Sequence, residues 1–197
     1  MSVSLPYAGL ANTGLANTGL AGVVAAAEGA RGLPPVHLWT PTHCGEIDIR
    51  IRRDGVWLHE GSPIGREALV RLFSTVLRKD PDGFHLVTPV EKLRIVVEDA
   101  PFVAVRVDRQ DGALVFLTNV GDRVAAGTDH PLRVVADPRT GEPAPYVHVR
   151  AGLDARLSRQ VFYELVEMAE ARETPSGPRL AVASGGAWFD LGAAGTA

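Results

Sequence analysis

The alternation of apolar and polar residues predicts a folded region made mainly of strands. Isoleucines occupy every second position of residues 47–51 and charged residues lie between them, the pattern of a strand with one buried face. Asp54-Gly55 follows, a dipeptide that favours a two-residue hairpin turn, and residues 56–60 return as a second strand. A strand hairpin therefore opens the folded region.

Two helices are predicted by apolar residues at three- and four-residue spacing. The stripe of the first helix comprises Leu69, Leu72, Phe73, Val76 and Leu77. The stripe of the second comprises Val161, Phe162, Leu165, Met168 and Ala169. Ser158 stands where a side-chain oxygen caps the first turn of the second helix.

Strands flank both helices, so the sequence predicts an α+β fold. The other predicted strands are 84–88, 91–98, 132–137, 146–150, 180–183 and 187–191. Each half then contains strand, strand, helix, strand, strand, which suggests an internal duplication. A hairpin over residues 102–118 would join the halves. The alternative is that two α+β stretches share a common element order without being related.

Composition changes along the chain and divides it into three parts. Residues 1–33 contain a repeated GLANT pentad and an Ala/Gly-rich run, which offer little to bury, so we expect a disordered or low-complexity tail. Pro34 and Pro35 then mark the entry to the folded part. We expect an N-terminal α+β unit at residues 34–100 and a C-terminal unit, including the connecting hairpin, at residues 101–197.

Charge and cysteine content exclude several classes of protein. The 197 residues carry a net charge of −3 with acids and bases interspersed, unlike a general nucleic-acid or anionic-membrane binder. No apolar run reaches the length of a membrane-spanning helix, and no basic residue precedes the apolar residues 20–27 as a secretion signal requires. A single cysteine fits a reducing compartment, so we expect a cytoplasmic protein.

Longer strings resemble a known bacterial family. They are HCGEIDIRI, GSPIGREALVRLFSTVLRKD, FHLVTPVEKLRIVVEDAPF, TNVGDRV, HPLRV, PYVHVRAGLDARLSRQVFYELVE and SGGAWFDLG. Over about residues 34–192 the chain closely resembles domain-of-unknown-function family 1285. The resemblance implies two α+β portions, the second similar to a pleckstrin-homology-like barrel closed by a helix. That barrel implies binding of a ligand or partner rather than catalysis, by analogy of fold alone.

Several polar residues are candidates for one pocket. If the halves are related, the loop that enters the first strand, the corner at Pro89, the start of the first helix and the end of the connecting hairpin can gather around one concavity. The candidate ligand-binding residues are Cys44, Asp48, Arg66, Glu91, Lys92 and Asn119. Arg66 or Lys92 would meet an anionic group and Asp48 would accept a donor. The structural alternative is an ion pair between Asp48 and Arg66 with no ligand.

No cofactor or metal is expected. The residues His43, Cys44, Glu46 and Asp48 are ligand types, but no spacing among them places two ligands on one strand face. The sequence contains neither a GxGxxG nor a Walker pattern, and Gly185-Gly186 is too isolated for a phosphate loop. These patterns predict a protein that holds no metal and no cofactor.

The sequence favours a binding or signalling module of uncharacterised function. A polar, anion-accepting pocket between two α+β units would take a small polar or anionic ligand, or a protein partner. One alternative is a thiol- or carboxylate-dependent hydrolase that uses Cys44, Asp48 and Glu91. Another is a structural adaptor without a ligand. The helix faces at residues 66–79 and 164–170 carry opposite charge, which would orient two halves or two chains of a homo-oligomer.

Overall fold

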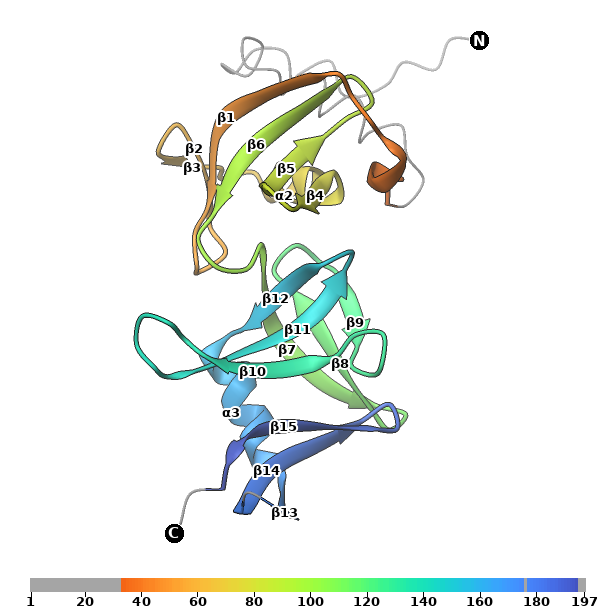
Figure 1. Ribbon diagram of the computed structural model, residues 1–197, viewed down its shortest axis with the longest axis vertical. Coiled ribbons are helices and arrows are strands. Elements are labelled where there is room, and N and C mark those ends of the chain that lie inside the picture. The colour runs from red at the N-terminus through yellow and green to blue at the C-terminus, as the bar shows by residue number, and fades with distance from the viewer. Residues whose placement is uncertain (1–32, 176, 195–197) are drawn as a thin grey trace. The chain divides into compact units, whose positions relative to one another are not determined.

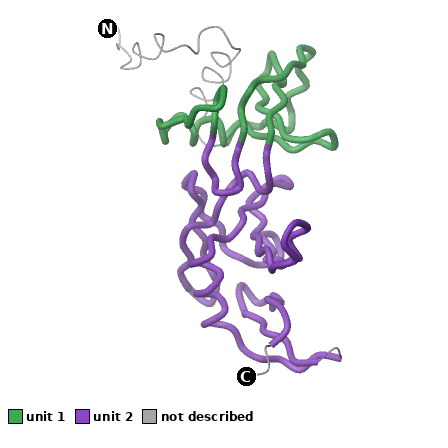
Figure 2. Tube along the Cα trace, turned by 90° about the vertical axis from the view of Figure 1, so that its left-hand side faces the viewer, with its two compact units in different colours: residues 1–50, 58–96 green, residues 51–57, 97–197 purple. Residues whose placement is uncertain are grey.

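A computed structural model describes residues 33–175 and 177–194 of the chain (Figure 1). The predicted tail therefore lies almost wholly outside the described residues. The chain divides into two compact units, residues 1–50 with 58–96 and residues 51–57 with 97–197 (Figure 2). The tip of the first hairpin thus belongs to the second unit.

The first unit is built on a six-stranded sheet with one helix. Its elements are η3 (Val36–Leu38), β1 (His43–Ile51), β2 (Trp57–His59), β3 (Ser62–Pro63), α2 (Glu67–Thr75), β4 (Leu77–Asp80), β5 (Gly83–Val87) and β6 (Glu91–Val97). The strand order is β3-β2-β1-β6-β5-β4. The end of β6 meets the end of β1, where Glu98 N–H donates to the Ile51 carbonyl, so these neighbours run in the same direction.

The helix of this unit is shorter than its apolar stripe. Leu69 and Phe73 of α2 are buried, as predicted, but the helix ends at Thr75. Val76 and Leu77 are also buried, yet Leu77 already pairs with Leu86 in the β4–β5 hairpin. The Asp-Pro-Asp-Gly segment at residues 80–83 therefore turns a hairpin rather than ending a helix.

The second unit combines another six-stranded sheet with a helix and a small sheet. The six-stranded sheet comprises β7 (Phe102–Gln110), β8 (Ala113–Thr118), β9 (Arg123–Ala125), β10 (Leu132–Ala136), β11 (Pro143–Arg150) and β12 (Leu153–Leu157), in the order β10-β11-β12-β7-β8-β9. β12 pairs with β7 in parallel. After α3 (Arg159–Glu167) come β13 (Glu170–Thr174), β14 (Gly177–Ser184) and β15 (Ala187–Ala193), a three-stranded antiparallel sheet.

Ser158 and Ser184 hold the helix and the small sheet in place. The Ser158 hydroxyl accepts from Val161 N–H, which confirms the predicted cap, and Val161 and Leu165 are fully buried. Buried Ser184 accepts from Leu114 N–H at 2.8 Å and donates to the Ala126 carbonyl at 2.7 Å. The turn of the β14–β15 hairpin is thereby tied to the larger sheet, which forms a half-barrel.

The two six-stranded sheets have the same connectivity. Each consists of two three-stranded meanders, and the last strand of the second meander lies beside the first strand of the first. The helices differ, because α2 lies between the meanders whereas α3 follows both. The hairpin predicted as a connector supplies β7 and β8 of the second sheet. The α+β class with repeated units is confirmed, whereas a duplication of the chain stays a prediction.

No helix among the described residues is both long and apolar enough to span a membrane.

Candidate functional site

An open hollow of ≈ 340 Å³ lies in the first unit beside the starts of β1 and β6. Polar residues from β1, β2 and β6 and from the turn after β2 dominate its lining: His43, Glu46, Asp48, His59, Glu60 and Glu91. Since β1 and β6 are neighbours that run in the same direction, the sheet brings Asp48 and Glu91 to one place. These are two of the six predicted residues.

The hollow has an acidic lining. Four carboxylates border it and no lysine or arginine does. Among the described residues, none of the four carboxylates forms a side-chain hydrogen bond or an ion pair. Grouped carboxylates create a negative potential that attracts cations and hydrogen-bond donors. The hollow therefore suits a group that donates hydrogen bonds rather than an anion.

Arg66 lines a second hollow of ≈ 280 Å³ beside α2. It is the residue that precedes the first turn of the helix, and its side chain is exposed. His59 borders both hollows, so the two adjoin. Within residues 33–175 and 177–194, Arg66 forms no ion pair with Asp48 or with any other acid. The alternative of a structural ion pair between Asp48 and Arg66 is therefore absent from the described residues.

Cys44 is exposed on β1 and lines neither hollow. Its neighbour on each side contributes to the acidic hollow, as expected from the alternation of side chains along a strand. No described residue forms a hydrogen bond with the Cys44 thiol. The cysteine is thus accessible, and no base among the described residues is hydrogen-bonded to it.

Lys92 belongs to a cluster of ions elsewhere in the first unit. Its ammonium lies 2.7 Å from Asp80 and 3.6 Å from Asp82, and Arg78 pairs with Asp80 at 2.9 Å. Burial raises the pKa of the Asp80 carboxyl, but hydrogen bonds from Lys92 and Arg78 outweigh it and hold that pKa below its usual value. Lys92 is therefore engaged within the fold.

A buried imidazole completes this cluster. His85 is 3 % exposed, with Nδ1 3.7 Å from Asp80 and Nε2 3.4 Å from Asp82. Burial, together with Lys92, lowers the pKa of His85. Asp80, Asp82 and His85 bring ligand atoms within 4.8 Å of one another, but Lys92 and Arg78 already neutralise the two acids. The arrangement is that of an ion cluster.

Asn119 lies in the second unit, where it holds backbone in place. Its Oδ1 accepts from Val103 N–H at 3.0 Å and its Nδ2 donates to the Gly55 carbonyl at 3.2 Å. The predicted residues thus fall into separate settings: Asp48 and Glu91 share a hollow, Arg66 lines the next one, and Cys44, Lys92 and Asn119 lie outside both. Ligand binding by these residues stays a prediction.

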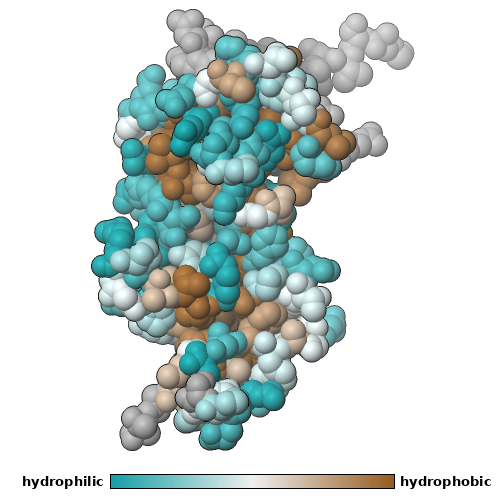
Figure 3. Space-filling model, viewed as in Figure 1, coloured by the Kyte–Doolittle hydropathy of each residue, from teal (hydrophilic) through white to brown (hydrophobic). Residues whose placement is uncertain are grey.

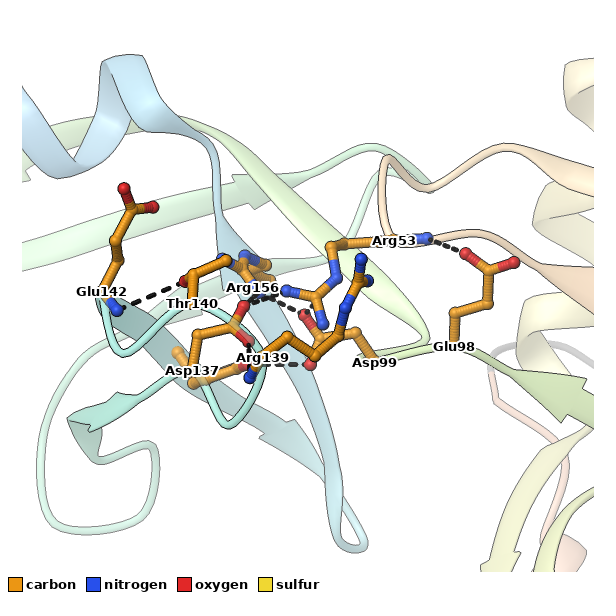
Figure 4. Close-up of polar contacts among 9 residues, drawn as sticks. Arg53, Glu98, Asp99, Asp137, Arg139, Thr140, Glu142 and Arg156 are labelled. Atoms are coloured by element: carbon orange, nitrogen blue, oxygen red, sulfur yellow. Dashed lines mark hydrogen bonds and ion pairs between the residues drawn. The ribbon is translucent and has the colours of Figure 1, made fainter.

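A second charged network, with no counterpart among the predicted residues, lies within the second unit (Figure 4). Arg156 pairs with Asp99 at 2.5 Å, Arg53 pairs with Asp137, and the Tyr146 hydroxyl donates to Asp99 at 2.7 Å. Burial and the hydrogen bond to Asp99 raise the pKa of Tyr146. The Arg139 N–H and Arg53 hold the pKa of Asp137 below its usual value. Two acids face two guanidinium groups, so the network is balanced in charge.

Comparison with known proteins identifies the family. Residues 34–100 match the N-terminal domain of the domain of unknown function DUF1285, and residues 101–191 match the C-terminal domain of the protein of unknown function DUF1285. The chain belongs to the DUF1285 family. No curated protein matches it.

Two solved structures are similar to the chain. A DUF1285 family protein from Silicibacter pomeroyi DSS-3 is 48% identical, with a TM-score of 0.78 over 87% of this chain and 95% of that one. A DUF1285 family protein from Shewanella baltica OS155 is 27% identical, with a TM-score of 0.49 over 60% of this chain and 90% of that one. The family resemblance expected from the sequence is confirmed.

Proposed function

We propose that this DUF1285 protein binds a small polar ligand in its N-terminal unit. Asp48 and Glu91 bind a hydrogen-bond donor or cationic group of the ligand. Arg66 binds an anionic group of the same ligand. The observation that carries the proposal is the pair of adjoining hollows around His59, one lined by carboxylates and the other by Arg66.

The charges in these hollows are available to a ligand. Asp48, Glu91 and Arg66 form no ion pair within the described part of the chain, unlike Lys92. A carboxylate and a guanidinium each form strong charge-assisted hydrogen bonds with groups of opposite charge. Binding would therefore replace water at groups that have no ion-pair partner among the described residues. The proposed ligand is therefore not purely anionic, because the acidic hollow would repel a second negative group.

Matched series of compounds test the charge pattern. The four-carbon series is putrescine, γ-aminobutyrate and succinate; the six-carbon series is hexamethylenediamine, ε-aminocaproate and adipate. Within each series only the terminal charges change. We expect the zwitterion of at least one series to raise the melting temperature and to give heat in calorimetric titration, the diamine to bind more weakly, and the diacid not to bind. Preferential binding of the diacids would contradict the proposal.

Variants assign the two ends of the ligand. Asp48→Asn should weaken zwitterion binding by about tenfold or more, and Arg66→Gln should do the same. Asp111→Asn and Arg94→Gln change exposed residues outside both hollows and serve as matched controls, with unchanged binding. Equal effects of all four variants would show that net charge, and not the site, governs binding.

A thiol-dependent hydrolase is the competing function. It requires an activated Cys44. An activated cysteine, with its thiol beside a base, reacts with alkylating agents faster at neutral pH than a free thiol does. We expect iodoacetamide to alkylate Cys44 at pH 7 at the rate of free cysteine, and Cys44→Ser to leave zwitterion binding unchanged. Faster alkylation, suppressed by Asp48→Asn or Glu91→Gln, would favour the hydrolase.

A further inference from the structure

Two edge strands of the C-terminal unit face each other without pairing. β10 is the first strand of the six-stranded sheet and β15 is the last strand of the three-stranded sheet. They lie side by side in Figure 1, and a hollow of ≈ 430 Å³ is lined by residues of both. No backbone hydrogen bond joins them among the described residues. The seam between the two sheets is therefore open.

The pairing register shows which groups of β10 are unpaired. Pro131 carbonyl accepts from His148 N–H, and Asp137 N–H donates to the Glu142 carbonyl, so the odd-numbered residues of β10 face β11. The even-numbered residues Val134 and Ala136 lie opposite Pro145 and Pro143, which have no N–H to donate. In an antiparallel pair the alternate residues point their N–H and C=O outward. Leu132, Val134 and Ala136 thus present them to the hollow.

The same alternation applies to β15. The hairpin turn Gly185-Gly186 places Ser184 opposite Ala187 as the closing pair, so the backbone groups of Trp188 face away from β14. The register shifts further along, between Leu180 and Ala181 of β14. Trp188 lines the hollow. Unpaired N–H and C=O groups therefore border it on two sides.

Side chains around the seam are apolar on the inside and mainly basic on the outside. Buried Leu132, Phe189 and Leu191 line the hollow, and hydrophobic surface shows in the region of β10 and β15 (Figure 3). Arg133 and Arg179 border it with exposed guanidinium groups. Each makes one ion pair, with Asp154 and Asp190, and a guanidinium has five N–H donors. Donors for a carboxylate therefore remain on both.

We propose that the edge of β10 binds an extended peptide in which apolar and acidic residues alternate. Its backbone would continue the six-stranded sheet, its apolar side chains would face Leu132 and Leu191, and its carboxylates would face Arg133 and Arg179. An acyl chain suits the apolar lining, but it would bury the unpaired backbone groups without a partner, which is costly. A polypeptide is the ligand class whose own backbone satisfies them.

Binding requires the seam to widen. Some Cα atoms of β10 lie within 8 Å of those of β15, whereas a strand paired on both sides needs about 9.6 Å, twice the usual strand spacing. The three-stranded sheet is fixed to the larger sheet at its hairpin end through Ser184. An outward shift of the β15 edge by a few ångström would admit the peptide.

Fluorescence anisotropy with labelled synthetic peptides tests the ligand class on the full chain. The probe is Val-Glu-Val-Asp-Val-Glu-Val, and the comparison peptides are its lysine counterpart and two forms N-methylated at even or odd residues. We expect the lysine peptide and at least one methylated form to bind at least about tenfold more weakly than the probe. Equal binding of the probe and both methylated forms would overturn the proposal, as would competition by decanoate at equal affinity.

A single proline substitution in the β10 edge tests whether this strand binds the peptide. Val134→Pro removes an outward N–H and leaves the bonds to β11 intact, so the fold should persist while the affinity for the probe falls about tenfold or more. Val134→Ala keeps the N–H and is the matched control, with affinity within about threefold of the wild type. Equal binding by both variants at unchanged melting temperature would exclude the β10 edge.

Residue-resolved hydrogen exchange gives a readout that needs no variant. The N–H groups of Leu132, Val134 and Ala136 should exchange fast in the free protein and become protected when the probe is added. Those of Arg133 and Val135, which pair with β11, should be protected in both states. No change at the even-numbered residues overturns the proposal. Their protection in the free protein, rising with protein concentration, would also overturn it, in favour of a second copy.

Discussion

The two charged clusters bury different titratable groups, and this difference predicts opposite responses to pH. In the first unit the buried group is the His85 imidazole, beside Asp80, Asp82, Lys92 and Arg78. In the second unit it is the Tyr146 phenol, beside two acids and two arginines. Burial disfavours the charged form of each, which is the imidazolium of one and the phenolate of the other. The first cluster is therefore sensitive to acid and the second to alkali.

Both clusters also join segments that are distant in sequence. Arg78 donates to the carbonyls of Val36 at 3.0 Å and Trp39 at 2.8 Å, and so ties η3 to the β4–β5 hairpin. Arg53, on the hairpin tip, pairs with Asp137 beyond the end of β10 (Figure 4). Because every acid in them has a basic partner, these clusters stabilise the fold. The acids on β1 and β6 differ, since Asp48 and Glu91 form no ion pair with the described residues.

Removal of the central acid of either cluster should have the largest effect on stability. Asp80→Ala leaves Arg78 and Lys92 without their shared partner, and Asp99→Ala does the same to Arg156 and the Tyr146 hydroxyl. Both acids are mostly buried, so each change should reduce the free energy of unfolding by about 2–4 kcal/mol in urea denaturation, somewhat less than for a fully buried pair.

The exposed pair between Glu67 and Arg71 is the control for these acids. Glu67→Ala removes an i,i+4 ion pair on a solvated helix face and should cost only about 0.5 kcal/mol or less. Similar losses for Glu67→Ala, Asp80→Ala and Asp99→Ala would show that burial does not distinguish the clusters.

The hairpin tip of the second unit should be next in sensitivity. Asn119→Ala removes two hydrogen bonds and leaves Val103 N–H and the Gly55 carbonyl unpaired, which should cost about 1–3 kcal/mol.

Gly55 has φ +84°, and an added Cβ would lie 2.7 Å from Asn119 Nδ2 and 2.9 Å from a Val103 methyl. Gly55→Ala should therefore destabilise to a similar degree in urea denaturation, whereas Gly112→Ala, with open space around it, tests backbone strain alone. Equal losses at both glycines would contradict close packing at the tip.

Local patterns predicted both helices and many of the strands, but not β3, β4, β9, β12 or β13, and not the arrangement of the sheets. The isoleucines of β1 alternate with polar residues because one face is buried, and Ser158 caps a helix through a local contact. Residues 102–118 were predicted as a hairpin, and β7 and β8 confirm it, but its place inside the second sheet was not predicted. Hairpins that join halves and hairpins that build a sheet have the same alternation. Sheet order depends on contacts between distant residues, which periodicity does not record.

The site shows the same limit. Asp48 and Glu91 line the same hollow because β1 and β6 are adjacent in the sheet. Lys92 was predicted to face the same pocket, yet Asp80 and Asp82, at the turn between β4 and β5, hold it elsewhere. Arg53 and Asp137 are 84 residues apart, with Asp99 between them in the sequence. All three lie in turns or near strand ends, where charged residues are ordinary. No local signal identifies such a network.

Tyr146→Phe should have a smaller effect at neutral pH and change the alkaline response. Loss of the hydrogen bond to Asp99 should cost about 1 kcal/mol. The raised pKa means that the unfolded state loses the phenolic proton first, so wild-type stability falls as pH rises above about 10. The variant should lose part of that dependence in urea denaturation between pH 9 and 11, with Tyr163→Phe, an exposed tyrosine, as control. Identical slopes for wild type and Tyr146→Phe would contradict burial of the phenol.

The smallest change at neutral pH is expected from His85→Phe, which keeps a buried aromatic ring at this position and removes the imidazole. Because the folded-state pKa of His85 is lowered, the unfolded state binds a proton first as pH falls below about 6.5. Wild-type stability should therefore decrease between about pH 6.5 and 5, before the carboxylates of Asp80 and Asp82 titrate. In the variant this decrease should be smaller, so the two urea midpoints should diverge in favour of His85→Phe as the pH is lowered. His37→Gln, at an exposed position in η3, controls for the loss of a histidine as such. Parallel profiles of stability against pH for wild type and His85→Phe would show that the imidazole accepts a proton in the folded state, with Asp80 and Asp82 as its partners. The first cluster would then not be sensitive to acid, and the proposed contrast between the two clusters would be wrong.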